Sequence, residues 1–294
     1  MSTQGYKEFI ESVLIKDLIQ KVKPVEQQRE LIDLPDTATI EEALDLLLAQ
    51  DIRSVPIYQP ETKKYIKIVS ALDLLRLLCT QAKDDLGEQV LQITLKEAIP
   101  LSEHLTVLKS TDSIVKLIQL FTIEHRVLVE QNQNYVLLSQ VDLIYYLQLE
   151  NHHLGSTLLD LSVSEIKSLG IHSKENYKIT AIDAFLKLGV DNRLSALPIV
   201  DDLGDFVTEL SASDLRGLNK KRWSSLKKPV IMYLKESHGE LLPPKTCHDQ
   251  FTLSQVLSAF SLRKANRLWW MDGQGQLQGV VTLTDIISTF ASYL

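Results

Sequence analysis

Four short motifs that join a hydroxyl to a carboxylate recur along the chain, with their aspartates 69 to 72 residues apart. Each has the form Ser/Thr-x-x-Asp and follows a short apolar stretch. An aspartate in the first turn of a helix presents two acceptor oxygens to hydroxyl groups, and the N-terminus of a helix attracts anions. The same tetrad can also act only as a helix cap, so both interpretations stay open for each copy. The four tetrads are Ser70-Ala71-Leu72-Asp73, Ser139-Gln140-Val141-Asp142, Ser211-Ala212-Ser213-Asp214 and Thr282-Leu283-Thr284-Asp285.

The tetrads mark a repeating unit of about 70 residues. An amphipathic helix precedes each one, and in the first unit it starts at the capping box Thr39-Ile40-Glu41-Glu42. A loop with an arginine, a strand, a turn and a second apolar strand then lead into the tetrad, and a helix-like segment follows it. This order predicts an α+β fold in which every unit contains a small sheet and two helices. We expect the four units at residues 1–85, 86–150, 151–222 and 223–294.

The length and composition of the chain fit four such units that pack in pairs. It has 294 residues, of which 45% are hydrophobic, and a unit of about 70 residues buries too little surface to be stable alone. The formal charge of −7 argues against a nucleic-acid or membrane-surface protein. The polar N-terminus is unlike a signal peptide, and no apolar run approaches the roughly 18 residues of a membrane span. We therefore expect a soluble protein of the cytoplasm or nucleus.

The residues that commonly bind metals form no recognisable metal-site pattern. The two cysteines, Cys79 and Cys247, support neither a disulfide framework nor a zinc site. His152 and His153 are adjacent in the connection at 150–164, but no partner ligands stand at zinc spacing from them. We expect solvated histidines there, and neither a metal nor a cofactor in the protein.

Several segments carry a resemblance to a known module. The order of helix, strand, hairpin, strand and tetrad resembles the cystathionine-beta-synthase (CBS) domain. Four such domains in one chain resemble the gamma subunit, the regulatory and nucleotide-sensing subunit of AMP-activated protein kinase. The resemblance implies four CBS repeats, paired into two Bateman modules that form a flat pseudo-symmetric disk. Its most specific segments are 51–56 (DIRSVP), 124–126 (EHR), 193–201 (RLSALPIVD), 266–268 (NRL) and 279–285 (GVVTLTD).

The resemblance also implies that AMP, ADP or ATP binds in the clefts, with the ribose on the tetrad aspartates and the phosphates on basic side chains. The two carboxylate oxygens suit the vicinal hydroxyls of a ribose. In an acidic protein the phosphates need dedicated cations, for which the fork of an arginine is well shaped. The ribose candidates are Asp73, Asp142, Asp214 and Asp285. The phosphate candidates are Arg53, His125, Arg126, Arg193, Arg267, Ser70, Ser211, Thr282 and Thr284, with Arg193 lying earlier in its unit than the other arginines.

The chain departs from the family pattern at several candidate positions. Asp142 stands where the gamma subunit usually has an arginine, and Val141 where it commonly has a lysine that meets phosphates. Asn266 replaces a histidine, and Lys67 replaces a small glycine before the first tetrad. The cation cluster is therefore thinner, and we expect altered phosphate discrimination.

These observations predict a non-catalytic regulatory subunit that binds adenine nucleotides and regulates a Ser/Thr protein kinase. Its partners would be the catalytic and scaffold subunits of that kinase. The alternative is a divergent CBS scaffold or inhibitor that acts by protein contact, for example on a phosphatase, with partly vestigial nucleotide sites. An enzyme is disfavoured, because the repeats occupy almost the whole length and no phosphate-loop or nucleophile motif is present.

Overall fold

The computed structural model describes residues 4–24, 30–81, 87–98, 105–166, 169–170, 173–191, 193–262 and 265–294. The chain divides into two compact units, each with its own hydrophobic core. Unit 1 comprises Met1–Leu31, Thr106–Ile171 and Lys245–Leu294, and unit 2 comprises Ile32–Leu105 and His172–Pro244. Within the described residues, no helix combines the length and the apolar character that crossing a membrane requires.

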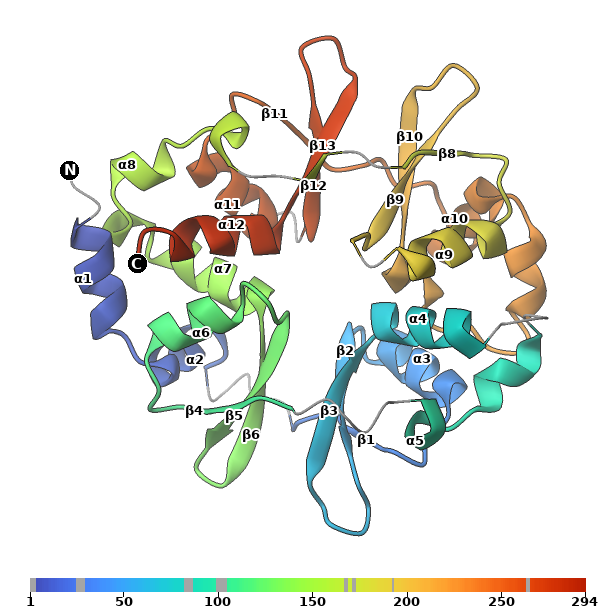
Figure 1. Ribbon diagram of the computed structural model, residues 1–294, viewed down its shortest axis with the longest axis horizontal. Helices are drawn as coiled ribbons and strands as arrows, with labels where there is room; N and C mark the ends of the chain where they lie inside the picture. Colours follow the sequence, from blue (N-terminus) through green and yellow to red (C-terminus); the bar gives the residue numbers. More distant parts are fainter. Residues whose placement is uncertain are drawn as a thin grey trace. The chain divides into compact units, whose positions relative to one another are not determined.

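Unit 1 contains two small sheets and the helices that cover them (Figure 1). One sheet has the strand order β4-β5-β6 and the other the order β11-β12-β13-β7. The strands are β4 (Val107–Lys109), β5 (Arg126–Gln131), β6 (Asn134–Ser139), β7 (Leu169–Gly170), β11 (Thr246–His248), β12 (Arg267–Met271) and β13 (Leu277–Thr282). The helices are α1 (Gln4–Ser12), α2 (Ile15–Val22), α6 (Ile114–Leu120), α7 (Gln140–Leu149), α8 (Ser156–Leu159), α11 (Leu253–Leu262) and α12 (Leu283–Ala291), with short 3-10 helices η3 (Asn151–His153) and η4 (Val163–Glu165).

Unit 2 has the same plan, with sheets of strand order β1-β2-β3 and β10-β9-β8. Its strands are β1 (Leu34–Pro35), β2 (Ser54–Tyr58), β3 (Tyr65–Ser70), β8 (Glu175–Asn176), β9 (Ala196–Val200) and β10 (Phe206–Ser211). Its helices are α3 (Ile40–Ala49), α4 (Ala71–Gln81), α5 (Leu95–Ala98), α9 (Ala181–Val190) and α10 (Val230–His238), with the 3-10 helices η2 (Glu88–Gln92), η5 (Ala212–Leu215) and η6 (Trp223–Lys227).

All four sheets share one pattern. A central strand pairs in parallel with a short edge strand on one side, and antiparallel with its hairpin partner on the other. In the second repeat, β4 pairs parallel with β5, and β5 pairs antiparallel with β6. The central strand is apolar on both faces, as its consecutive buried residues Val127, Leu128 and Val129 show. Asn132 and Gln133 join the hairpin with positive φ angles of 50° and 67°, as a tight hairpin turn requires. The predicted α+β fold of four small-sheet repeats is therefore confirmed.

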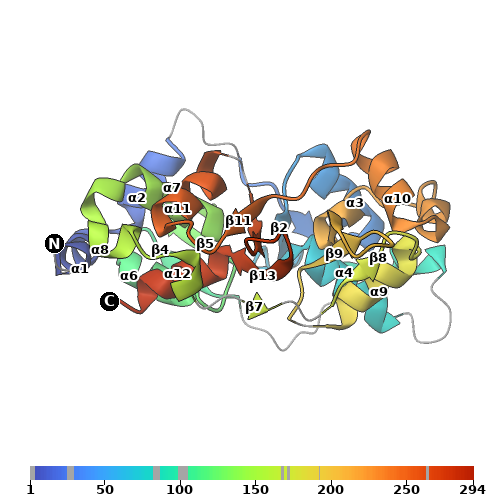
Figure 2. The same cartoon turned by 90° about the horizontal axis from the view of Figure 1, so that it is seen from above.

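Each compact unit combines two repeats that are not consecutive in the sequence. In both views α7 lies beside α11, and α4 lies beside α9 (Figures 1 and 2). The second and fourth repeats thus share the core of unit 1, and the first and third share that of unit 2. Residues 1–31, which we counted with the first repeat, belong to unit 1, where the hydroxyl of Tyr6 donates to the carbonyl of Phe290 at 3.1 Å.

The repeat limits stay a prediction, and the one between residues 85 and 86 lies outside the described residues. The compact units follow the packing of helices, whereas the predicted limits follow the spacing of the tetrads. Both descriptions place one tetrad in every small sheet.

The segment after the third tetrad differs from our expectation of a helix in every repeat. α4, α7 and α12 follow the other tetrads, but the third continues only into the 3-10 turn η5. Gly217 ends this turn with a φ of +72°, and its N–H donates to the carbonyl of Leu44 at 2.8 Å. A Cβ on Gly217 would lie 2.3 Å from Cδ2 of Leu48, so the leucine side chain would have to move, and the positive φ itself favours glycine. The chain then turns through η6 into α10.

Candidate functional site

All four tetrads form capping boxes at the junction of a strand with a helix or 3-10 turn. The backbone N–H of the first residue donates to Oδ2 of the aspartate, at 2.8 Å in Ser70, 2.7 Å in Ser139, 2.6 Å in Ser211 and 2.7 Å in Thr282. The hydroxyl of the same residue donates to the same oxygen, at 2.5 to 3.0 Å. The helix-cap interpretation therefore holds for every copy. A ligand must use the other oxygen, Oδ1.

The hydroxyls that we expected to bind phosphate take part in these caps. Oγ of Ser70 and Oγ1 of Thr282 also accept from the backbone N–H of Asp73 and Asp285, each at 3.3 Å. Ser211 has the same reciprocal arrangement with Asp214. Each hydroxyl thus donates and accepts inside its own tetrad. The structure assigns these three hydroxyls a capping role, and their phosphate contacts stay a prediction.

At the second and third tetrads, a basic side chain already occupies Oδ1. Lys23, at the end of α2, places its Nζ 3.2 Å from Oδ1 of Asp142. His238, the last residue of α10, places its Nε2 2.9 Å from Oδ1 of Asp214. The hydrogen bond to Asp214 raises the pKa of His238, and partial burial opposes that rise.

At the first and fourth tetrads, no described residue forms a hydrogen bond or ion pair with Oδ1 of Asp73 or Asp285. Asp285 is partly buried, and this desolvation raises its pKa, although the cap hydrogen bonds from Thr282 lower it. Of the four tetrad aspartates, Asp285 and Asp73 are therefore the two whose Oδ1 has no partner among the described residues. Unit 1 contains one of them and unit 2 the other.

The strand registers show how each arginine stands relative to its tetrad. Arg126 pairs with Ser139 across β5 and β6, and Arg267 pairs with Thr282 across β12 and β13. Directly opposed residues of an antiparallel pair have side chains on the same face of the sheet, about 5 Å apart at Cβ. Arg126 and Arg267, which we expected in loops, are therefore the first residues of strands and lie beside the tetrads; their phosphate contacts stay a prediction.

The other two arginines precede the strand residues that pair with the tetrads. Arg53 comes one residue before Ser54, the residue that pairs with Ser70. Arg193 comes three residues before Ala196, the residue that pairs with Ser211, so its earlier position is confirmed. Its exposed guanidinium forms a bidentate ion pair with Asp191, with Nε–Oδ1 at 3.0 Å and Nη2–Oδ2 at 2.8 Å. The guanidinium of Arg193 is therefore already paired with Asp191.

Two further predicted residues lie at the contact between the second and fourth tetrads in unit 1. The side-chain amide of Gln140 donates to the hydroxyl of Thr284 at 2.9 Å and to the carbonyl of Phe121 at 2.8 Å. The backbone N–H of Gln140 donates to the carbonyl of His125 at 3.1 Å, and the side chain of His125 is exposed. Gln140 therefore joins the two tetrads of this unit, with Thr284 as its partner.

No local signal in the sequence marks Lys23 or His238 as neighbours of the tetrads, or Gln140 as the contact of the second tetrad with the fourth. Lys23 precedes its aspartate by more than one whole repeat, and His238 follows its aspartate across two further helical segments. Only the packing of α2 and α10 brings them there. A basic residue at the end of a helix is a common pattern, because it complements the helix dipole, so the pattern alone does not single these two out.

Comparison with known proteins supports the fold and the type of repeat. The model of the CBS domain matches residues 22–80. The chain is 28% identical to the "SNF1-related protein kinase regulatory subunit gamma-like PV42b" of Arabidopsis thaliana, over 91% of this chain and 93% of that one. It is 22% identical to the "5'-AMP-activated protein kinase subunit gamma" of Saccharomyces cerevisiae, over 98% and 92%. The solved structure of protein MJ1225 from Methanocaldococcus jannaschii superposes with a TM-score of 0.71 at 15% identity, covering 92% of this chain, and shows the same fold.

Proposed function

We propose that this chain, whose repeats resemble the CBS domain and whose relatives include gamma subunits of AMP-activated protein kinase, is a regulatory subunit that binds adenine nucleotides at its tetrads. Its relatives are named as regulatory subunits of protein kinases. The proposed partners are accordingly the catalytic and scaffold subunits of a Ser/Thr kinase. The nucleotide is a regulatory ligand in this proposal, and the tetrads have no catalytic role.

The observation that carries the proposal is the state of the Asp285 carboxylate. Its Oδ2 is fixed by the cap, while Oδ1 has no partner among the described residues. An acceptor oxygen in this position can receive the hydrogen of a ribose hydroxyl. Arg267, directly across from Thr282, offers a cation for the phosphate on the same face of the sheet.

Asp73 has the same geometry in unit 2, with Oδ2 in the cap and Oδ1 unpaired among the described residues. We therefore place the ribose of a nucleotide first at Asp285 and Asp73. At Asp142 and Asp214 a ribose would have to displace Lys23 or His238. These two sites should bind more weakly, and the four predicted ribose sites become two classes.

Isothermal titration calorimetry with AMP, ADP and ATP tests this proposal. The informative variant is Asp285→Asn, because asparagine keeps an oxygen to accept the cap hydrogen bonds but presents an amide donor where a ribose needs an acceptor. We expect at least a tenfold loss of affinity at that site. The control Asp272→Asn makes the same chemical change in the turn between β12 and β13, where Asp272 accepts from the N–H groups of Gln274 and Gln276. This variant should bind nucleotides as the wild type does. Wild-type protein that binds none of the three nucleotides would refute the proposal.

The paired states of Asp142 and Asp214 favour one alternative, a scaffold or inhibitor that acts by protein contact. In that case Asp73 and Asp285 would also bind no nucleotide. Purification of the full chain from its native cells separates the two functions. Kinase catalytic and scaffold chains in stoichiometric amounts support the regulatory subunit, and a different stable partner together with an absence of nucleotide binding supports the scaffold.

A further inference from the structure

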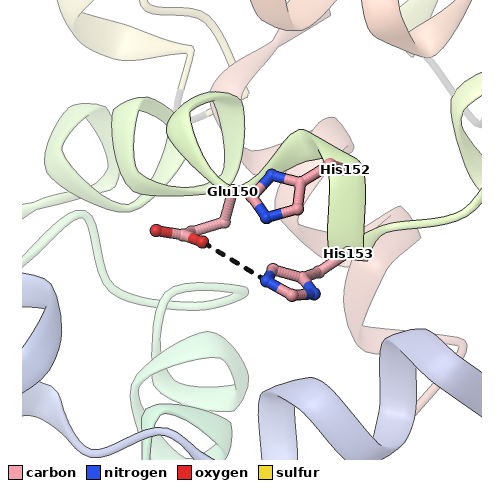
Figure 3. Close-up of side chains that lie close together, drawn as sticks. All are labelled: Glu150, His152 and His153. Atoms are coloured by element: carbon pink, nitrogen blue, oxygen red, sulfur yellow. Dashed lines mark ion pairs between the residues drawn. The ribbon is translucent and has the colours of Figure 1, made fainter.

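A cluster of three potential metal ligands lies at the end of α7, away from the tetrad at its start. Glu150 is the C-cap residue of α7, and η3 follows it directly. The N–H of His153 donates to the carbonyl of Glu150 at 2.9 Å, which closes a 3-10 turn. Side chains three residues apart eclipse in such a turn, so Glu150 and His153 face the same side. Figure 3 shows the carboxylate directed toward the ring of His153, with the ring of His152 beside it.

The carboxylate of Glu150 is nearly buried and only half satisfied. Its side chain is 5% exposed, and Nζ of Lys21 contacts Oε1. The other oxygen, Oε2, has Nε2 of His153 at 3.7 Å, which is beyond hydrogen-bonding distance. Among the described residues no other donor reaches Oε2. Oε2 therefore has lone pairs available to a bound cation.

The spacing of the three ligand atoms suits a small divalent ion. One atom from each of Glu150, His152 and His153 lies within 4.8 Å of the others. Zinc binds carboxylate oxygen and imidazole nitrogen at about 2.0–2.2 Å, so its ligand atoms are roughly 3.3 Å apart in a tetrahedral site. The separation of 3.7 Å between Oε2 and Nε2 of His153 is close to this value. The third ligand, His152, is exposed and can rotate toward the ion.

The packing of α1 holds the ring of His153 in place. The ring stacks on Phe9 of α1, with centroids 4.3 Å apart and planes 13° from parallel. Both histidines are exposed, as expected, but Glu150 directly precedes η3 and lies within reach of them, a neighbour that zinc spacing in the sequence does not indicate.

We propose that Glu150, His152 and His153 form a surface site for a divalent ion of the zinc type. Two imidazoles and one carboxylate are a ligand set used by zinc, and imidazole disfavours magnesium and calcium. The ion would bind Oε2 of Glu150, opposite the ammonium group of Lys21 on Oε1. The fourth coordination position would face solvent. The positive charge of Lys21 lies close enough to repel the ion, so it should lower the affinity of the site.

Titration of the chelator-treated, reduced full chain with zinc chloride, without nucleotide, tests the site. We expect one ion per chain, and at least a tenfold weaker affinity in the double variant His152→Gln/His153→Gln. His248→Gln removes an exposed imidazole from β11 in the same unit and should leave the affinity unchanged. The two cysteines do not compete strongly, because burial raises the pKa of each thiol, to about 11 in Cys79 and to about 12 in Cys247.

Lys21→Met separates a metal site from a merely structural cluster. Removal of the ammonium group should strengthen zinc binding severalfold and should give a larger rise of the Tm on zinc addition than in the wild type. A structural role alone predicts only destabilisation, without a gain in zinc affinity. The proposal is overturned if the wild type binds no zinc, or if the double histidine variant binds it as tightly. Neither result bears on nucleotide binding, since no tetrad residue is changed.

Discussion

Asp285 and Asp214 occupy equivalent positions in two capping boxes, yet their outer oxygens meet different surroundings. Oδ1 of Asp285 has no partner among the described residues, whereas Oδ1 of Asp214 lies 2.9 Å from Nε2 of His238. The same contrast separates Asp73 from Asp142, which Lys23 holds. Each compact unit thus contains one tetrad with an unpaired outer oxygen and one with a paired outer oxygen. A local motif therefore specifies the cap, and a distant basic residue decides whether the remaining oxygen is available.

The segments that follow the two tetrads explain part of the difference. After Asp285 the chain continues into the regular helix α12. After Asp214 it leaves η5 at Gly217 and returns through α10, where the hydroxyl of Tyr233 donates to the carbonyl of Asp214 at 2.7 Å. The same helix ends at His238. Because the third tetrad continues into a 3-10 turn and then α10, the imidazole of His238 lies beside the carboxylate of Asp214.

The largest expected effect comes from changing the two tetrad classes separately. The double variant Asp73→Asn/Asp285→Asn should lose at least tenfold in affinity for AMP or ATP at both sites, since each site loses a charged acceptor for the ribose hydroxyls. The matched double variant Asp142→Asn/Asp214→Asn makes the same change in the paired class and should lose less than threefold. Calorimetric titration of both proteins measures the difference. Equal losses in both would remove the distinction between the classes.

Asp285→Asn should not reduce stability at neutral pH, which keeps that titration interpretable. Because burial raises the pKa of Asp285, the folded protein holds its proton to a higher pH than the unfolded chain, whose aspartates titrate near about 3.9. The stability contribution of Asp285 therefore falls as pH rises through its folded pKa, and asparagine removes this loss. Urea unfolding at pH 7 should give an equal or higher free energy of unfolding, whereas a clear decrease would contradict the desolvated state of the carboxylate.

Gly217→Ala tests the turn that distinguishes the third tetrad. The residue has a φ of +72°, and a Cβ would lie 2.3 Å from Cδ2 of Leu48, so we expect a loss of about 2–3 kcal/mol in the free energy of unfolding. Gly204→Ala is the control, since Gly204 has a φ of +88° but open space around its Cα. It should cost about 1 kcal/mol from backbone strain alone. If the two variants lose the same stability, the close packing of Gly217 against α3 has no energetic consequence.

The pairing of His238 with Asp214 should depend on pH. The raised pKa of His238 means that the ion pair stabilises the folded protein fully below about pH 6.5, and that this contribution is lost as pH rises through the folded pKa. The pair is partly exposed and contributes at most about 1 kcal/mol. A nucleotide that competes with His238 for Asp214 should therefore bind the third tetrad a few times more tightly at pH 8 than at pH 6.

The matched variant for this pH dependence is His238→Ala. Its nucleotide affinity at the third tetrad should exceed that of the wild type at pH 6 and should change little with pH. Titrations at the two pH values, performed in the background Asp73→Asn/Asp285→Asn, isolate the paired class. A pH dependence that persists in the alanine variant would show that His238 is not the competing group.

The smallest expected effect concerns Arg193. Its guanidinium already forms a bidentate pair with Asp191, so Arg193→Ala should change nucleotide affinity less than twofold. Arg267→Ala, at the residue directly opposite Thr282, should weaken binding about tenfold. The comparison of the two variants in one titration series tests whether strand register predicts which arginines meet phosphate. A larger loss from Arg193→Ala would show that Asp191 releases it when a ligand binds.

The sequence was a good guide wherever structure depends on neighbouring residues. The capping boxes at Thr39, Ser139 and Thr282 follow from residues three positions apart, and the central strands follow from short apolar runs. The early position of Arg193 was also visible as a register difference. The availability of the aspartates was not visible, because Lys23 and His238 reach them through the packing of separate helices. The cluster at Glu150 was missed because the 3-10 geometry of η3, rather than zinc-like spacing, brings the ligands together.

The alternation of repeats between the two units also governs the order in which the chain can fold. All segments of unit 2 lie within residues 32–244, so its core can be completed before the last part of the chain is synthesised. Unit 1 must wait for β11, β12, β13 and α12, and its contact between Tyr6 and Phe290 joins residues almost a full chain length apart. Contacts of such high order carry a large loop-closure cost and form late. During synthesis, therefore, the apolar faces of α6 and α7, which pack against α11 and α12, stay uncovered until the C-terminal segments are made, and they are where a nascent chain of this protein most needs protection from aggregation.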